Sequence, residues 1–233
     1  MLDVKLEEEK YLKKSFLDAW ENLPLLLVGD IFFCLFCIPF MILFISDPVL
    51  PALWLGCFTI APAFSGLVYL TGKIARGEKF GVKDIVFGIF HFYGRSIVLG
   101  SLIALLISFS VATFGMTKAN PDQVWLIGSL AIQLAALLFV ALLSVYAFSL
   151  MTIYDISLKK TLIYAFVLVS SYKMPTIGLL SLAVLFAFLM WWTKFGLILV
   201  FPVLWAVFSS NLTLLLVRKH QSQRGQRHFI NGK

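Results

Sequence analysis

Charged residues are scarce in this chain, and their scarcity excludes a soluble globular domain. Asp, Glu, Lys and Arg make up 13% of the residues and hydrophobic residues make up 61%, with a mean hydropathy of +0.95. A soluble domain contains about 25% charged and about 45–50% apolar residues, so it could not enclose this much apolar surface. The composition therefore predicts a protein embedded in a membrane.

Groups that perform catalysis or bind metals are equally few, with three histidines and three cysteines in the chain. His220 and His228 lie in a basic tail and are expected to be solvated. Cys34 and Cys37 form a C-x-x-C inside an apolar run, where packing is expected rather than metal or redox chemistry. The sequence has no phosphate-binding loop, zinc-protease or serine-hydrolase signature. These absences predict a protein that is not an enzyme and uses no cofactor or metal ion.

The sequence consists mainly of long apolar runs. A helix needs about 20 apolar residues to cross about 30 Å of hydrocarbon, and no segment alternates with the period of a membrane β-strand. The predicted fold is all-α: a cytoplasmic amphipathic helix at 1–22, a six-helix transmembrane domain at 23–217 and a basic cytoplasmic tail at 218–233. The six predicted spans are Pro24–Ile45, Pro51–Leu70, Ser96–Thr113, Val124–Met151, Thr176–Trp192 and Phe195–Val217.

Basic residues are distributed asymmetrically between the connections of these spans. Only two of the nineteen Lys and Arg residues, Lys118 and Lys194, lie in connections after the first, third and fifth spans. Cytoplasmic connections carry the excess of Lys and Arg, so both termini are predicted to be cytoplasmic in a multi-pass protein of the cell membrane. One broken span over 176–217 would place the basic tail outside, which favours six spans over five. The other seventeen are Lys5, Lys10, Lys13, Lys14, Lys73, Arg76, Lys79, Lys83, Arg95, Lys159, Lys160, Lys173, Arg218, Lys219, Arg224, Arg227 and Lys233.

Three amphipathic segments are expected on the inner membrane face. Leu6–Glu21 places Leu12 and Phe16 on one helical face, which favours an interfacial helix over a docking site for a cytoplasmic partner. Gly81–Arg95, which contains His91, and Asp155–Lys173 have polar starts followed by apolar residues. Their basic residues predict the bilayer and its anionic headgroups as partners, at about 1 kcal/mol per Lys or Arg near the surface. No nucleic acid is needed to explain them.

The order span–amphipathic segment–span occurs twice, over residues 51–113 and 124–192. The match is one of hydropathy and charge, with few identical residues. It indicates a parallel internal repeat about an axis normal to the membrane, an arrangement found in carriers and also in proteins without a transport role.

Two stretches resemble the YesL-like family of bacterial membrane proteins. In Ile60–Ser96 the similarity lies in a Pro and small-residue run, a basic turn and an aromatic helix; in Val145–Gly178 it lies in an S-L-K helix start and a Lys-x-Pro restart. The resemblance covers roughly residues 15–217 and implies a non-enzymatic companion of carbohydrate uptake systems. The matching positions are Ala61-Pro62-Ala63, Arg76-Gly77-Glu78, Phe87 through Arg95, Ser157-Leu158-Lys159 and Lys173-Met174-Pro175.

Three polar residues within predicted spans form the candidate site. Asp30 is the only acidic residue well inside a span, and intramembrane ionisable residues are functional candidates, although this one could also be protonated or merely tolerated. Asn211 and Gln133 are expected to form interhelical hydrogen bonds. By depth, Asp30 and Asn211 could meet in the inner half of the bundle, whereas Gln133 lies nearer the outer half.

Two functions remain open at this point. One is a non-enzymatic accessory protein of a sugar transporter, as the resemblance implies. The other is a transporter, or a permease-like subunit of an ABC importer, for a small solute, which the repeat would suit. Ser157-Leu158-Lys159-Lys160 lacks the acidic residue and the glycine that such permeases present to their ATPase.

The charge asymmetry makes a prediction about topology. Reporter tags placed after Pro48 or Lys118 should be accessible from outside, and tags within Gly72–Lys83 or after Lys233 should be accessible only from the cytoplasm. Protection from a membrane-impermeant reagent in intact cells measures this directly. An externally reactive C-terminus would contradict the six-span topology.

Overall fold

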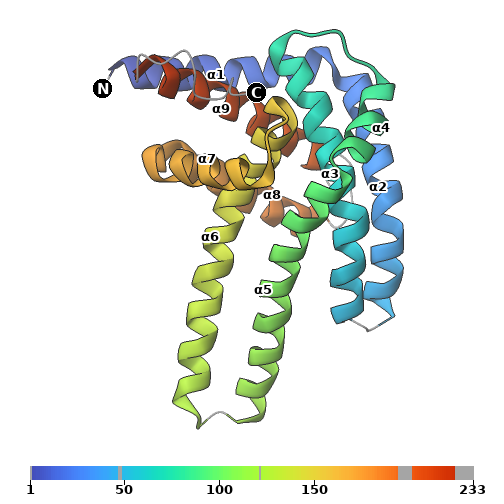
Figure 1. The fold of residues 1–233 in the computed structure, drawn as a ribbon, viewed down its shortest axis with the longest axis vertical. Coiled ribbons are helices and arrows are strands. Elements are labelled where there is room, and N and C mark those ends of the chain that lie inside the picture. Colours follow the sequence, from blue (N-terminus) through green and yellow to red (C-terminus); the bar gives the residue numbers. More distant parts are fainter. Residues whose placement is uncertain (1, 47–48, 121, 194–200, 224–233) are drawn as a thin grey trace.

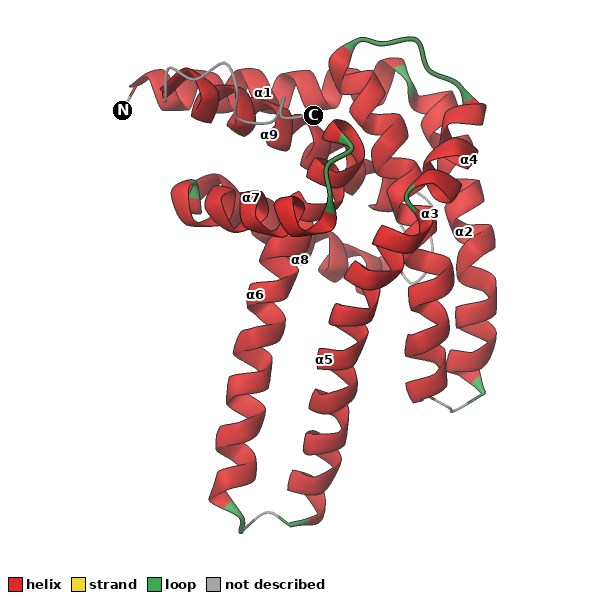
Figure 2. Ribbon diagram, in the orientation of Figure 1, coloured by secondary structure: helices red, strands yellow, loops and turns green. Residues whose placement is uncertain are grey.

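The computed structural model describes residues 2–46, 49–120, 122–193 and 201–223, and within these ranges all regular structure is helical (Figure 2). This confirms the all-α prediction. The predicted N-terminal helix is present, and helices occur in both segments that the sequence placed on the inner membrane face; that placement stays a prediction. The described helices are α1 (Leu2–Glu21), α2 (Leu23–Ile45), α3 (Val49–Arg76), α4 (Val82–His91), α5 (Tyr93–Ala119), α6 (Val124–Tyr154), α7 (Leu158–Ser171), α8 (Lys173–Thr193) and α9 (Phe201–Gln223).

Local residues explain where α3 and α6 end and where α4 begins. Gly77, with φ of 70°, follows the last residue of α3 in a conformation that favours glycine. Gly81 precedes α4 and donates its backbone N–H to Asp84 at 2.8 Å, so an acidic side chain satisfies the first free amide of that helix. Asp155, with φ of 46°, ends α6 in the left-handed region.

Helix α3 is the centre of the bundle and contacts α2, α4, α5, α6 and α9. Its buried face consists largely of small residues, which allow neighbouring backbones to come close; membrane helices associate through such surfaces because lipid provides no hydrophobic drive. Pro62 lies inside α3, and Ser65 donates its hydroxyl to the Pro62 carbonyl at 2.7 Å. The small buried residues of α3 are Ala52, Gly56, Cys57, Ala61, Ala63, Ser65, Gly66, Thr71, Gly72 and Ala75.

The closest approach is between α3 and α4. A Cβ atom at Gly88 would lie 3.0 Å from the Cα of Gly66, and a Cβ at Gly66 would lie 2.7 Å from the carbonyl oxygen of Ile85. Both contacts are with backbone atoms, which cannot rotate away as a side chain can. The two glycines therefore hold α4 directly against α3.

The packed core lies at one end of the molecule. In α6, residues 145–153 are all buried, whereas most side chains before Val145 are partly or fully exposed. Tyr146, Leu150 and Leu67 are completely buried in this core, together with much of α9. Away from the core, α5 and α6 continue as a long hairpin that extends past α2 and α3 (Figure 1). The bundle is thus tight at one end and open at the other.

Helices α1 and α9 pack side by side and run across the end of the α5–α6 hairpin (Figure 1). The small residues Ser15 and Ala19 of α1 are buried, while the apolar face predicted from Leu12 and Phe16 is 46% and 63% exposed. Trp20, on the same helix, is 77% exposed. In lipid this surface needs no protein cover, as expected for a helix at the membrane interface.

Five described helices are long and apolar enough to cross a membrane: α2, α3, α5, α6 and α9 up to His220. A sixth results if α7 and the first part of α8 form one span, although a bend of 99° separates Leu158–Ser171 from Lys173–Leu182. The sequence placed a span at Thr176–Trp192 alone, and its crossing of the bilayer stays a prediction. Lys194 and residues 195–200 of the last predicted span lie outside the described residues.

The connections separate as the charge pattern requires. The start of α1, the α3–α4 and α6–α7 connections and the end of α9 lie in the same half of the molecule, opposite the α2–α3 and α5–α6 connections (Figure 1). The predicted tail is helical in its first part, since α9 continues to Gln223. The remainder of that tail, including Arg224, Arg227, His228 and Lys233, lies outside the described residues, as does Pro48.

Both halves of the predicted repeat have the order long helix, short helix, long helix, in α3–α4–α5 and α6–α7–α8. Their packing differs. Helix α5 packs along α3, whereas α8 contacts α7 and α9 and leaves α7 through the 99° bend.

The Gly66–Gly88 contact predicts a strong effect of one methyl group. Gly66→Ala should lower the free energy of unfolding by about 1–3 kcal/mol, because the new Cβ overlaps a backbone oxygen of α4. Thermal unfolding in mild detergent measures the change. Gly128→Ala is the matched control, because a Cβ there meets nothing within 4 Å and alanine is the better helix former by about 1 kcal/mol. Equal melting temperatures for both variants would contradict the close approach.

Candidate functional site

Asp30 lies on the buried face of α2 and is 0% exposed. The backbone amide of Val203, in the first turn of α9, faces its carboxylate, but no described group forms a hydrogen bond of ordinary geometry with either oxygen. The positive end of the α9 dipole favours an acidic group at this place. Pro202 removes one amide from that turn, so the helix offers fewer donors than usual. Asp30 is thus a buried carboxyl without a direct partner among the described residues.

Asn211 does not meet Asp30, so the pairing predicted from depth is wrong. Its side-chain amide donates to the Asp18 carboxylate at 3.0 Å and joins α9 to α1. Asn211 is 5% exposed and Asp18 is partly buried, so this is a partly buried polar contact between distant segments of the chain. Depth along the membrane normal could not reveal it, because Asp18 belongs to a helix outside the predicted spans.

Gln133 forms interhelical hydrogen bonds, as predicted. Its side-chain amide donates to Thr113 on α5 at 2.9 Å and to Ser129 on its own helix at 3.2 Å. The bond to Thr113 joins the two helices of the projecting hairpin, far from Asp30. The three predicted site residues therefore lie in three separate environments and form no common site.

Hydroxyl groups meet where α3, α6 and α9 cross. Thr71 and Ser210 lie 2.9 Å apart, and Ser149 donates to Ser209 at 3.2 Å. All four side chains are buried and are surrounded by large apolar residues of the core. Each hydroxyl finds its partner within the protein, so this crossing is held by polar contacts without requiring water.

A groove of about 780 Å³ lies between α1, the α7–α8 junction and α9. Its deep wall is apolar: Leu179, Leu212 and Leu216 are each less than 5% exposed. Tyr11 closes one side by donating its hydroxyl to the Phe208 carbonyl at 2.8 Å. Burial raises the pKa of Tyr11 above its ordinary value, so its phenol stays a neutral donor.

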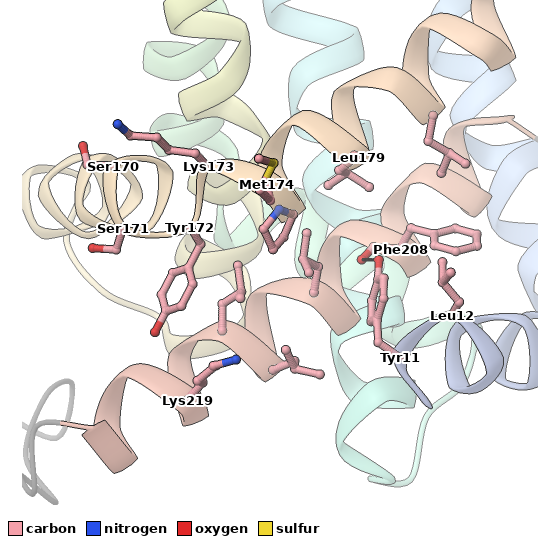
Figure 3. Close-up of a pocket in the computed structure, with 16 residues that line it drawn as sticks. Tyr11, Leu12, Ser170, Ser171, Tyr172, Lys173, Met174, Leu179, Phe208 and Lys219 are labelled. Carbon is pink, nitrogen blue, oxygen red and sulfur yellow. Dashed lines mark hydrogen bonds between the residues drawn. The ribbon is translucent and has the colours of Figure 1, made fainter. Parts of the chain in front are cut away.

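The groove is polar at one end only. Ser170, Ser171, Tyr172, Lys173 and Lys219 gather at that end, whereas Leu179, Phe208, Leu12 and Tyr11 lie toward the other (Figure 3). Sequence reasoning missed this groove. Its walls come from three segments far apart in the chain, and no local pattern of residues indicates that they meet.

Ion pairs join the end of α4 and the start of α5 to the end of α6. Arg95 at the start of α5 donates to Asp155 at 2.6 Å, and His91 at the end of α4 lies 3.2 Å from the same carboxylate. Partial burial opposes ionisation of Asp155, but the Arg95 and His91 contacts outweigh it and lower the pKa of the carboxyl. Arg76 also bonds the Ile153 carbonyl at 2.6 Å. His91 therefore has a positioning role in the described structure.

His220 was expected to be solvated, and this expectation is wrong. Helix α9 continues past the last predicted span and buries His220 to 7% exposure, with its ring 6.3 Å from that of Tyr172.

Cys34 and Cys37 are both free and half-buried on α2. Within the described residues, no three His, Cys, Asp or Glu side chains are grouped closely enough to hold a metal ion.

Comparisons with known proteins found no matching protein family, no matching curated protein and no matching solved structure. The resemblance to YesL-like proteins therefore stays a prediction.

The Asp18–Asn211 hydrogen bond predicts energetic coupling between α1 and α9. Asp18→Ala and Asn211→Ala should each destabilise the protein, and the double variant should lose less than the sum by about 0.5–3 kcal/mol. Unfolding in mild detergent measures this cycle. Asp30→Leu combined with Asn211→Ala is the control pair, for which additive effects are expected. A coupling to Asp30 instead of Asp18 would restore the pairing predicted from the sequence.

Proposed function

We propose that this protein is a non-enzymatic accessory component of a membrane transport system, and specifically of carbohydrate uptake. The observation that carries the proposal is the α5–α6 hairpin, which leaves the packed core and exposes apolar side chains along its length (Figure 1). Phe109, Phe114 and Ile132 are 57%, 61% and 73% exposed. A partner within the bilayer can pack against both helices of this hairpin.

The centre of the bundle supports an accessory role over a carrier role. At the crossing of α3, α6 and α9, the hydroxyls of Thr71, Ser149, Ser209 and Ser210 bond to one another. Tyr146 and Leu150 fill the same region and are 0% exposed. A carrier needs polar groups that are free to bind its substrate, and these hydroxyls are already paired.

Carbohydrate as the transported substrate is supported only by the resemblance of Ile60–Ser96 and Val145–Gly178 to YesL-like sequences. Helix α7 does not favour the alternative of an importer permease. It begins at Ser157-Leu158-Lys159-Lys160, without the pattern that an importer permease presents to its ATPase.

A transporter for a small solute is the second candidate, and Asp30 favours it. A buried carboxylate without a hydrogen-bond partner among the described residues could take up a proton or a cation during transport. In that case Asp30→Asn should abolish solute uptake by the purified protein in proteoliposomes while leaving the fold intact. A fully active Asp30→Leu variant would end this second candidate.

The accessory role predicts a specific complex. Purification in mild detergent from the native membrane should yield the protein together with a transport permease, its ATPase or a solute receptor. Phe109→Ala with Ile132→Ala should lower recovery of that complex at least tenfold, because two buried anchors at an interface together contribute about 2–4 kcal/mol and about 1.4 kcal/mol is a factor of ten. Quantitative mass spectrometry of the eluate measures the ratio.

The matched control changes two exposed apolar residues of α2, Ile31→Ala with Leu35→Ala, and should leave recovery of the complex unchanged. Solute uptake by the purified protein alone would contradict the accessory role.

A further inference from the structure

We propose that the groove between α1, the α7–α8 junction and α9 is a specific site for an anionic glycerophospholipid, such as phosphatidylglycerol. One acyl chain occupies the apolar end and the phosphate lies at the lysine end. The proposal is independent of the transport role, since it rests on the lining of the groove alone. A volume of about 780 Å³ lies within the range of about 300–1,000 Å³ typical of sites that bury a small molecule.

The groove has one apolar end and one polar end, as a phospholipid has apolar acyl chains and a polar headgroup. Leu179, Leu212 and Phe208 line the apolar end of the groove, and the Tyr11 hydroxyl donates to the Phe208 carbonyl. An acyl chain placed there leaves no polar group of the wall without a partner. A polar solute would gain few hydrogen bonds at this end.

The opposite end matches an anionic headgroup. Lys173, Lys219, Ser171 and Tyr172 line this end of the groove, and within the part of the chain that the structure describes no acidic residue lines it. The chain has no Asp or Glu after Asp155, so the region that forms α7, α8 and α9 is uniformly basic. Lysine ammonium and hydroxyl groups are suitable donors to a phosphate, and a zwitterionic choline headgroup would bring a positive charge beside them.

The surroundings favour a lipid over a soluble ligand. Two apolar residues that line the groove, Met174 and Leu12, are 79% and 46% exposed, and Leu12 belongs to the apolar face of α1. The helices that carry them lie at the end of the molecule where the basic connections gather (Figure 1). A lipid can therefore enter sideways from a membrane leaflet without crossing water.

Gly178 keeps the groove open. A Cβ atom at this position would meet nothing within 4 Å, so the space beside it is groove and not protein. A larger side chain here can occupy the lipid position without displacing a neighbouring residue. It also replaces a helical glycine by a better helix former, which does not weaken α8.

Photo-labelling tests the proposal on the full chain. The protein is reconstituted in phosphatidylcholine vesicles that contain a few mole per cent of phosphatidylglycerol with a diazirine in its acyl chain, and in a second set the diazirine is on phosphatidylcholine. Peptide mapping should find the phosphatidylglycerol probe on α8 and α9 around Leu179 and Leu212, about five- to tenfold above the phosphatidylcholine probe.

Two sets of variants separate the two ends of the site. Gly178→Leu should abolish labelling of α8 and α9 by both probes, and Gly178→Ala should reduce it less. Lys173→Gln with Lys219→Gln should lower phosphatidylglycerol labelling to the phosphatidylcholine level while the acyl position remains labelled. Gly128→Leu, at another open helical glycine, should change nothing at this site. Lys159→Gln with Lys160→Gln, which removes two charges outside the groove lining, should also have no effect there.

Equal labelling by both probes in the unmodified chain would overturn the proposal, and so would unchanged labelling in Gly178→Leu, because both results describe ordinary boundary lipid. A cross-link between two copies of the chain through Leu179 or Leu212 that excludes the lipid probe would assign the groove to self-association instead. Matching melting temperatures for all variants establish that a loss of labelling is not a loss of fold.

Discussion

The close packing of five helices around the small residues of α3 is the constraint on which the rest of this structure depends. Gly66 lets α4 approach backbone to backbone, and Gly72 receives the Ile153 side chain of α6. Thr71 reaches both the Ala206 carbonyl and the Ser210 hydroxyl of α9. In lipid, contacts of this kind supply the stability that the hydrophobic effect gives a soluble protein, because leaving an apolar side chain in hydrocarbon has little cost.

This close packing occurs at one end of the bundle, and at the other end the α5–α6 hairpin has few contacts with the remaining helices. The core forms where α6 and α9 cross α3, and the α5–α6 hairpin continues beyond it (Figure 1). The free hairpin is the surface on which the accessory role rests. The packed end brings α1, α7, α8 and α9 together, and the lipid groove lies between them. The two proposed interactions therefore occupy opposite ends of the molecule and result from the same asymmetry of packing.

The polar residues show which hydrogen-bond partners can be predicted from the depth of a residue in the membrane and which cannot. Gln133 bonds its neighbour across the hairpin, as expected of an amide on adjacent helices. Asn211 instead bonds Asp18, which lies 193 positions away, and Asp30 is left beside the first turn of α9. Depth is read from position within a span. The partner of a side chain depends on the rotation of each helix and on which helices touch, and neither quantity appears in the hydropathy of one segment.

The sequence by itself predicted the helical class, six spans that include the five long apolar helices of the described structure, the three amphipathic helices and the asymmetry of charge, because each depends on local composition and on the thickness of a bilayer. Tertiary structure decided that α9 lies beside α1, that a 99° bend separates α7 from α8 and that Asp30 has no direct partner among the described residues. It also decided that Lys173 and Lys219 border one apolar groove. These features depend on contacts between segments distant in the chain, where the shapes of small and large side chains select one packing among many of similar hydropathy.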